Sequence, residues 1–384
     1  MRNFIFQNPV KLIFGKGEIA RLRDEIPVDA RILLTYGGGS IKRNTVYDQV
    51  MDALKDHEVI AFGGIEPNPR YETLMKVVEI VKDKKVDFLL SVGGGSVLDG
   101  TKFIAAAVKY TGDPWGFMQN WGSIKEAMPF GAVLTLPATG SEMNCGSVIT
   151  REATREKLAF RTPLVYPKFS ILDPTTTFTL PPHQTANGII DTFVHVTEQY
   201  LTFSAVAPLQ DRFAESILLT LVEEGHKAMA NSHDYDARAN LMWCATMGLN
   251  GLLSLGVPTD WATHIIGHEL TAKCGLDHAQ TLAIILPSLL YIKRENKREK
   301  LLQYAKRVWQ LTEGSEETRI LKAIDKTREF FESLGVKTRL SEYKISPDII
   351  PSMLQSYESH GFVALGERQD IDLKEIEEIL LYSM

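Results

Sequence analysis

The feature that most constrains the fold of this chain is a repeated pairing of a short apolar run with a Gly-Gly-Gly-Ser segment. Residues 31–36 (RILLTY) lead into Gly37-Gly38-Gly39-Ser40, and residues 87–92 (DFLLSV) lead into Gly93-Gly94-Gly95-Ser96. Short apolar runs bounded by glycine are consistent with buried strands, and the amphipathic spacing over residues 71–81 predicts a helix between them. Strands that alternate with helices predict a largely parallel sheet with helices on both faces.

The spacing of apolar residues changes after Pro181-Pro182. Before this pair, the apolar runs 132–136 and 169–172 predict two further strands, whereas beyond it almost only helical periodicity occurs. The clearest helical stretches cover residues 211–224, 236–249, 261–273, 298–311, 316–333 and 374–382. The sequence therefore predicts an α/β domain over residues 1–180 and an all-helical domain over residues 181–384. We expect the active site in the cleft between the two halves, because domain interfaces commonly hold ligands.

The composition argues against several classes of protein. The chain has 42 Lys and Arg against 48 Asp and Glu, and its net charge of -6 does not favour binding to nucleic-acid phosphates. Its three cysteines, Cys145, Cys244 and Cys274, are scattered and odd in number, which favours a reducing compartment over a disulfide framework. The sequence shows no secretory signal and no apolar run long enough to span a bilayer. We expect a cytoplasmic protein that binds neither nucleic acid nor membranes.

The two glycine turns predict a dinucleotide site. Glycine lets the backbone approach a phosphate closely, and the start of a following helix offers free N–H groups and a positive dipole end. A single turn of this kind is also common for steric reasons alone, but two in consecutive strand–helix units favour a functional role. We assign Gly93 to Ser96, followed by Asp99 and Lys102, to the pyrophosphate. Neither turn matches G-x-G-x-x-G, so no standard Rossmann fingerprint is inferred.

The residues after the first turn favour NADP(H) over NAD(H). Gly37 to Ser40 is followed by Ile41, Lys42 and Arg43, with no acid at the position where a carboxylate would select an unphosphorylated ribose. Glycine amides, a hydroxyl and two cations suit a 2′-phosphate, although such cations are also common as solvated surface charges. A third segment, Thr135-Leu136-Pro137-Ala138-Thr139-Gly140-Ser141-Glu142, is rich in hydroxyls and backbone donors that suit the nicotinamide and its ribose.

Carboxylate and imidazole side chains at helical spacing predict a metal site in the second half. Asp191 and His195 are spaced i, i+4, His264 and His268 repeat that spacing, and His278 follows soon after. A lone helical histidine is usually a packed or surface residue, but two such pairs and a further histidine in a chain with dinucleotide turns favour a site. Mixed oxygen and nitrogen ligands suit Zn²⁺ or Fe²⁺. Spacing alone does not rank His264 against His268 as a ligand.

The chain resembles the iron-containing (group III) alcohol dehydrogenase family along essentially its full length. The segments that carry the resemblance are KLIFGKG, LTYGGGSIK, FGGIEPNPRYET, LLSVGGGSVLDGTKFIA, LTLPATGSEMN, DTFVHVTEQY and GVPTDWATHIIGHELTAKCGLDHAQTLAI. They are most similar to the branch of NADPH-dependent aldehyde reductases and butanol dehydrogenases. Asp277-His278-Ala279 stands where many relatives have Pro-His-Gly, which argues against transferring the substrates of the diol and glycerol enzymes.

The resemblance implies a fold, a site and an activity. The fold would be an N-terminal dinucleotide-binding α/β domain and a helical C-terminal domain, the plan shared with dehydroquinate synthases. The family's metal ligands match Asp191, His195, His264 and His278, and its cleft histidine matches His268. Its cofactor-binding positions match Gly37, Gly38, Gly39, Ser40, Gly93, Gly94, Gly95, Ser96, Asp99, Thr135, Thr139 and Lys157. Its members are typically homodimers or larger, with iron or zinc.

From these residues we expect a metal-dependent oxidoreductase that interconverts small aldehydes and primary alcohols with NADP(H). The metal would act as a Lewis acid on the substrate oxygen, and His268 would exchange a proton. Two alternatives remain open at this point. One is a lyase of the dehydroquinate synthase type, which would need more cationic groups near the metal than this sequence offers. The other is a non-catalytic dinucleotide-binding protein.

Overall fold

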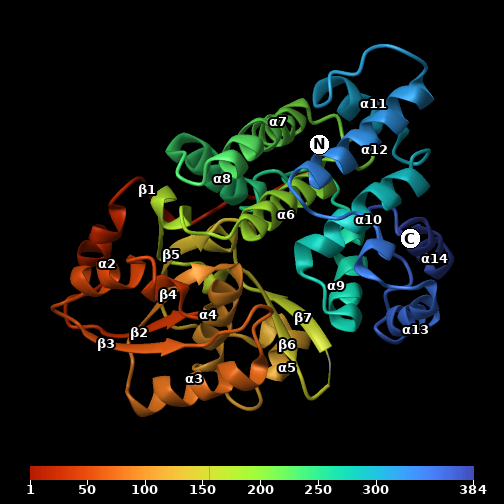
Figure 1. Cartoon of the computed structure of the whole chain (residues 1–384). Coiled ribbons are helices and arrows are strands. Elements are labelled where there is room, and N and C mark those ends of the chain that lie inside the picture. The colour runs from red at the N-terminus through yellow and green to blue at the C-terminus, as the bar shows by residue number, and fades with distance from the viewer. Residues whose placement is uncertain (155) are drawn as a thin grey trace. The chain divides into compact units, whose positions relative to one another are not determined.

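The four apolar runs predicted as strands belong to one parallel sheet in the computed structural model, which describes residues 1–154 and 156–384 (Figure 1). Two further strands, Lys11–Phe14 and Glu58–Gly63, bring this sheet to six strands. Its strand order is β1-β8-β5-β4-β2-β3, and every neighbouring pair is parallel. The strands are β1 (Lys11–Phe14), β2 (Arg31–Tyr36), β3 (Glu58–Gly63), β4 (Phe88–Gly94), β5 (Phe130–Leu136) and β8 (Phe169–Leu172). The carboxyl ends of β2 and β4 carry the two glycine turns, which is where ligands bind in open parallel sheets.

Helices cover both faces of this sheet, as the alternating pattern predicts. Successive residues of a strand point to opposite faces, so Leu33 and Leu89 join one apolar cluster while Ile32 and Leu90 join the other. The first cluster includes residues of α3 (Tyr71–Asp83), α4 (Gly95–Ala107) and α5 (Trp115–Gln119), and the second includes residues of α1 (Leu22–Glu25) and α2 (Val46–Ala53). A two-stranded antiparallel hairpin of β6 (Gly146–Arg151) and β7 (Glu156–Arg161), which the sequence analysis did not predict, also belongs to this part of the chain.

The chain beyond Leu180 is helical. Its helices are α6 (Pro182–Tyr200), α7 (Pro208–Ala230), α8 (Tyr235–Gly248), α9 (Ala262–Cys274), α10 (His278–Ile292), α11 (Arg298–Arg307), α12 (Glu316–Ser333), α13 (Ile350–Ser359) and α14 (Leu373–Tyr382). An N-terminal α/β part followed by a helical part is the predicted fold class, which is therefore confirmed. Among the described residues, none of the helices combines the length and apolarity that crossing a bilayer requires.

The compact units of the structure are not two continuous segments. One unit holds Gln7–Leu180 together with Ser232–Thr246, and the other holds Met1–Phe6, Pro181–Asn231 and Met247–Met384. The change at Leu180 lies where the sequence changes rhythm, but Met1–Phe6 and most of helix α8 are assigned differently from the ranges 1–180 and 181–384. Those two ranges remain our prediction for the functional domains.

Candidate metal centre and cofactor-binding turns

Helix α6 presents the first two candidate ligands. Pro182 occupies its first turn, where a missing backbone N–H has no cost, and the helix runs from there to Tyr200. Every residue from Gly188 to Tyr200 is buried, so α6 is enclosed on all sides rather than amphipathic. Asp191 and His195 lie one turn apart on it, and their side chains are only 6% and 7% exposed. A buried carboxylate and a buried imidazole on one helix face require partners, and the structure supplies them from two other helices.

The turn between α9 and α10 places the next two candidates. Gly275 ends α9 in the left-handed conformation, with φ of 69°. Asp277 then begins α10 through a reciprocal capping box with Gln280, which makes His278 the first residue of that helix. Asn187, one turn before Asp191 on α6, donates its side-chain amide to Asp277 Oδ2 at 3.2 Å. These contacts fix the start of α10 close to the ligand-bearing part of α6.

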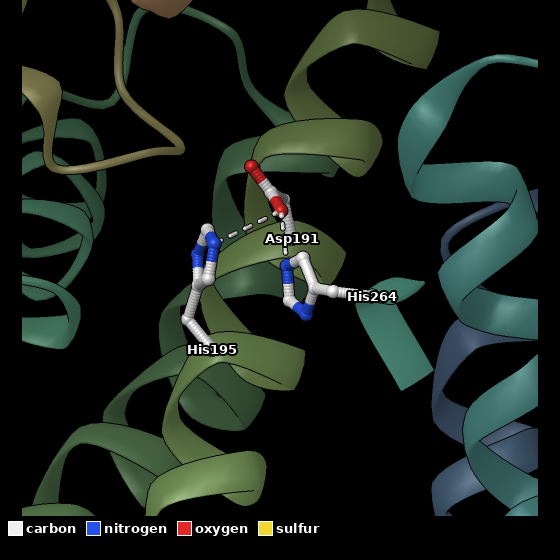
Figure 2. Close-up of side chains that lie close together, drawn as sticks. All are labelled: Asp191, His195 and His264. Carbon is white, nitrogen blue, oxygen red and sulfur yellow. Dashed lines mark ion pairs between the residues drawn. The ribbon is translucent and has the colours of Figure 1, made fainter. Parts of the chain in front are cut away.

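Three imidazole nitrogens surround one carboxylate oxygen. Asp191 Oδ1 lies 3.6 Å from His195 Nε2, 3.7 Å from His264 Nε2 and 3.7 Å from His278 Nε2. Figure 2 shows the imidazoles of His195 and His264 directed at this oxygen from two sides. Candidate ligand atoms of Asp191, His195 and His264 all lie within 4.8 Å of one another, a grouping that does not include His278. The structure thus brings the three predicted histidine ligands to one oxygen of the fourth, Asp191.

These distances and atoms fit a divalent cation. Bonds of about 2.1 Å to a tetrahedral ion separate neighbouring ligand atoms by roughly 3.4 Å, close to the observed 3.6–3.7 Å. Asp191 Oδ1 and His264 Nε2 are buried and have no hydrogen-bond partner among the described residues. Buried polar atoms are nearly always satisfied, so such a pair at the centre of an imidazole cluster indicates a site for an ion.

The electrostatics of the cluster agree with this interpretation. Burial raises the pKa of the Asp191 carboxyl, but the facing imidazoles, led by that of His195, outweigh burial and hold the pKa well below its usual range. Burial lowers the pKa of His264, yet the carboxylates of Glu198 and Asp191 outweigh it and raise that pKa to about 9. Both shifts arise because two buried carboxylates, those of Asp191 and Glu198, face imidazoles, and a divalent cation bound at this place would displace the imidazole protons.

His268 and Glu198 complete the surroundings. The ring of His268 is half-buried, with its centroid 5.0 Å from that of His278 and 6.3 Å from that of His264. Glu198, which the sequence analysis missed, is buried and contacts His264 Nδ1 through its Oε2. The available signal was its position seven residues after Asp191, which continues the same face of α6.

The second glycine turn fits closely against the loop after β5. Strand β4 passes directly into helix α4 at Gly95, so this turn opens a full helix as predicted. A Cβ placed on Gly94 would lie 3.0 Å from the Cβ of Leu136, and one placed on Gly95 would lie 2.6 Å from two side-chain atoms of Thr139. The structure therefore brings the second turn together with two residues of the third predicted segment, Leu136 and Thr139.

A buried polar cluster holds that loop in place. Lys102 is fully buried and donates to Ser141 Oγ at 2.8 Å, Asn144 Oδ1 at 3.0 Å and the Gly146 carbonyl at 2.8 Å. Asp99 accepts hydrogen bonds from the Ser141 hydroxyl at 2.7 Å and the Val148 amide at 2.9 Å. Both carboxylate oxygens of Asp99 thus hold protein groups, one in the loop between β5 and β6 and the other on β6 itself.

The first turn, unlike the second, does not open directly into a full helix, which corrects the sequence expectation. Gly37 to Ser40 leads into a three-residue 3-10 turn, Ser40–Lys42, and helix α2 begins only at Val46. No long helix therefore adds its dipole at this turn, and any anion here would depend on backbone amides and nearby cations. Gly38 and Gly39 have open space where a Cβ would point, and the Lys42 ammonium lies 5.0 Å from the ring centres of Tyr36 and Tyr47.

The two remaining predicted cofactor residues, Thr135 and Lys157, belong to the same compact unit as the glycine turns. Thr135 is buried near the end of β5, and Lys157 lies on β7 with its ammonium 2.9 Å from Asn68 Oδ1. Asn68 itself adopts a left-handed conformation with φ of 55°, which this residue type tolerates better than most. The contact ties the hairpin to the segment that follows β3.

With the two sites in view, comparison with known proteins gives the family. The profile described as "Iron-containing alcohol dehydrogenase" matches residues 9–174, and the profile "Fe-containing alcohol dehydrogenase family, C-terminal" matches residues 185–384. The chain belongs to the iron-containing alcohol dehydrogenase family and is an oxidoreductase. The resemblance drawn from its motifs is therefore confirmed.

Individual relatives narrow the likeness to one branch. The chain is 60% identical over 376 residues to the NADPH-dependent aldehyde reductase YqhD of Escherichia coli, a match that covers 97% of each protein. It is 40% identical to the NADH-dependent butanol dehydrogenase A of Clostridium acetobutylicum over 99% of each. A crystal structure of E. coli YqhD superposes with a TM-score of 0.98 at 58% identity, covering 100% of this chain and 99% of the other. An NADH-dependent butanol dehydrogenase A from Thermotoga maritima superposes with a TM-score of 0.94 at 36% identity, with coverage of 100% and 99%.

Proposed function

We propose that the protein is a metal-dependent oxidoreductase that interconverts small aldehydes and primary alcohols with NADP(H), working chiefly as an aldehyde reductase. The observation that carries the proposal is the buried Asp191 Oδ1, which has three imidazole nitrogens within 3.7 Å and no hydrogen-bond partner among the described residues. The names of the relatives support the substrate class, since they include an aldehyde reductase and butanol dehydrogenases. Family membership favours this activity over a lyase or a non-catalytic binding protein.

Asp191, His195, His264 and His278 are the proposed metal ligands. A bound Fe²⁺ or Zn²⁺ would supply Lewis acidity toward the oxygen of the aldehyde or alcohol. A single carboxylate among three neutral imidazoles leaves a site with net positive charge when a divalent ion is bound, and such a site favours an oxygen that gains negative charge. The low pKa of Asp191 keeps this carboxylate ionised at neutral pH.

His268 is the proposed proton-exchanging residue. Its ring lies beside His278, outside the group formed by Asp191, His195 and His264, and it is half-buried rather than enclosed. A ring nitrogen of His268 would hold a proton near the substrate oxygen and exchange it with solvent. Its role is thus distinct from that of His264, one turn earlier on α9.

The cofactor would bind along the two glycine turns. We assign Gly93, Gly94, Gly95 and Ser96 to the pyrophosphate, because the start of α4 offers free amides there. The 2′-phosphate would meet Gly37, Gly38, Gly39 and Ser40, with Lys42 supplying charge, and the open space at Gly38 and Gly39 leaves room for it. Thr135, Leu136, Thr139 and Lys157 would contact the nicotinamide half, and Asp99 would act by fixing the loop that carries Thr139.

The decisive experiment combines metal analysis with turnover. Wild-type protein, His264→Ala and, as a matched control, His183→Ala would be assayed with NADPH and butanal before and after chelation. His183 lies on α6 as well but is exposed, so its loss should change neither metal content nor rate. We expect His264→Ala to lose bound metal and at least 100-fold in turnover, in keeping with the several kcal/mol that a Lewis acid contributes. Retention of both properties by His264→Ala would overturn the ligand assignment.

A cytoplasmic location and a homodimer complete the proposal. Among the described residues Cys145, Cys244 and Cys274 form no disulfide, as suits a reducing compartment. The dimer follows from the family resemblance. Size-exclusion chromatography with light scattering would give a mass near twice the 43.0 kDa of one chain if it is correct.

A further inference from the structure

Helix α6 carries a third acidic or imidazole side chain on the face that presents the candidate ligands. Glu198 follows Asp191 by seven residues and His195 by three, so all three share one stripe of the helix. Its side chain is only 2% exposed. A carboxylate buried this completely is costly unless both of its oxygens are used.

Both oxygens of Glu198 are used by helix α9. Oε1 accepts the backbone N–H of Thr263 at 2.6 Å, and Oε2 contacts Nδ1 of His264. The N-cap residue of α9 is Trp261, which has a φ of 69° and provides no side-chain cap. Glu198, which lies on α6, therefore accepts a hydrogen bond from one of the free N–H groups in the first turn of α9. At the same time it contacts the adjacent imidazole of His264.

This contact gives the two ring nitrogens of His264 different roles. A neutral imidazole has one proton, and a carboxylate only accepts hydrogen bonds, so the Glu198 contact favours the proton on Nδ1. Nε2 is then left with its lone pair, and it points at Asp191 Oδ1, 3.7 Å away. Metal-ligating histidines commonly pass their other N–H to a carboxylate, which fixes the ring and its tautomer.

We propose that Glu198 is a positioning residue for the metal centre: through Nδ1 it fixes the tautomer and the ring orientation of His264, so that Nε2 is ready to bind the ion. This inference rests on the proposed metal site. A second contact supports the same arrangement, because the Asp260 amide donates to the Glu198 carbonyl at 2.8 Å. Asp260 is in turn paired with the buried ammonium of Lys297 at 2.7 Å, so the approach to α9 is held on both sides of Trp261.

A purely structural role for Glu198 would also satisfy α9, so the variant must separate capping from ring orientation. Glu198→Gln does this, because the amide oxygen can still accept the Thr263 N–H. Its NH₂ group, however, would face Nδ1 as a donor and favour the tautomer with its proton on Nε2. The chain offers a matched control in Glu269→Gln. Glu269 is also buried, lies on α9 and pairs with His360 Nδ1 at 2.8 Å, but His360 is not a proposed ligand.

The test is titration of the full-length apo-protein with Co²⁺ alone, followed by its visible absorption and by competition with a chromophoric chelator. We expect wild-type protein to bind one Co²⁺ per chain. Glu198→Gln should have a Kd for Co²⁺ about 10–100-fold higher than wild type and an altered visible spectrum, whereas the Kd of Glu269→Gln should lie within about threefold of wild type. An unchanged Kd and spectrum for Glu198→Gln would overturn the inference while leaving the metal site intact. If His264→Ala binds Co²⁺ as tightly as wild type, both the site and the role of Glu198 are refuted.

A second measurement needs no variant of Glu198 and covers the case in which Glu198→Gln does not fold. Nitrogen-15 NMR of wild-type protein labelled at histidine, with Zn²⁺ added, reports which ring nitrogen carries the proton. We expect a protonated Nδ1 and a metal-bound Nε2 for the resonance that disappears in His264→Ala. Metal bound to Nδ1 would refute the proposal.

Discussion

Replacing Gly95 by alanine tests whether the second glycine turn is shaped by close packing. The new Cβ would lie 2.6 Å from both Cγ2 and Oγ1 of Thr139, and 3.2 Å from its Cβ. Thr139 cannot easily withdraw, because its hydroxyl accepts the Ser141 amide at 3.2 Å and its carbonyl accepts the Asn144 side chain at 3.3 Å. The strain must therefore move the turn itself, which carries the amides proposed for the pyrophosphate.

The expected cost follows from these two close contacts. Overpacking of a tight site by one methyl group costs about 1–3 kcal/mol, and we expect a loss of unfolding free energy in that range for Gly95→Ala. A displaced turn also loses one or more hydrogen bonds to a charged phosphate, each worth about 1.5–3 kcal/mol, so NADPH should bind roughly tenfold or more weakly. Urea denaturation measures the first quantity and titration of NADPH fluorescence the second.

Two further variants make the reasoning refutable. Thr139→Ala removes both atoms at 2.6 Å, so Gly95→Ala should cost less stability in the Thr139→Ala background than in wild type. We expect the loss in that background to be at most half of the loss in wild type. Gly38→Ala is the matched control on the first turn, where a Cβ meets no atom within 4 Å. We expect Gly38→Ala to weaken NADPH binding without a loss of stability. A Gly95→Ala protein as stable as wild type, or an equal loss in the two backgrounds, would show that the close packing is not what shapes this turn.

Three other predictions concern the metal, a buried lysine and the cofactor. Protein kept at a free metal concentration of 100 times Kd should have a free energy of unfolding about 2.7 kcal/mol higher than protein whose metal a chelator has removed. Calorimetry that shows the same Tm for both samples would contradict the site. Burial lowers the pKa of Lys102 to about 8, so between pH 8 and about 10.5 the unfolded chain binds a proton there that the folded chain does not. The free energy of unfolding of wild type should therefore rise with pH relative to that of Lys102→Met, by up to about 3 kcal/mol. Urea unfolding of both proteins at pH 7.5 and 10 checks this, and parallel pH profiles would count against it. Lys42→Ala should raise the Kd of NADPH several-fold and leave that of NADH unchanged, which fluorescence titration with both cofactors measures; equal effects on the two would mean that Lys42 does not contact the 2′-phosphate.

The elements that local pattern defines were predictable from the sequence. Strands β2, β4 and β8 and helices α3 and α12 lie at or within two or three residues of their predicted ranges, because burial on both sides of a parallel sheet and amphipathic helix spacing leave strong local signals. The hairpin of β6 and β7 was missed because its strands, GSVITR and EKLAFR, lack a clear alternation of apolar and polar residue types, although burial alternates along β6. The assignment of Ser232–Thr246 to the sheet-bearing unit depends on tertiary contacts, which no local pattern records.

The candidate site shows the same division between local and tertiary information. The spacing of Asp191 and His195 could be recognised directly, since an i, i+4 pair on one helix is a local property. The distinction between His264 and His268 could not, because both lie on α9 at equivalent spacing. Only the packing of α9 against α6, with His264 Nε2 3.7 Å from Asp191 Oδ1, separates them in the structure. Glu198 escaped notice for the same reason, as its partner is 66 residues away.

The two candidate sites should respond to substitution in different ways. At the second glycine turn the absence of a side chain is the requirement, so almost any replacement acts by steric displacement and its effect can be worked out from distances to neighbouring atoms. At the metal centre the requirement is a set of nitrogens and oxygens brought together by α6, α9 and α10. Because α6 carries two ligands and the carboxylate that orients a third, a small rotation of this one helix would disturb three of the four proposed ligands at once. Its burial on all sides from Gly188 to Tyr200 is what opposes such a rotation, so we regard the packing of α6 as part of the metal site rather than as background to it.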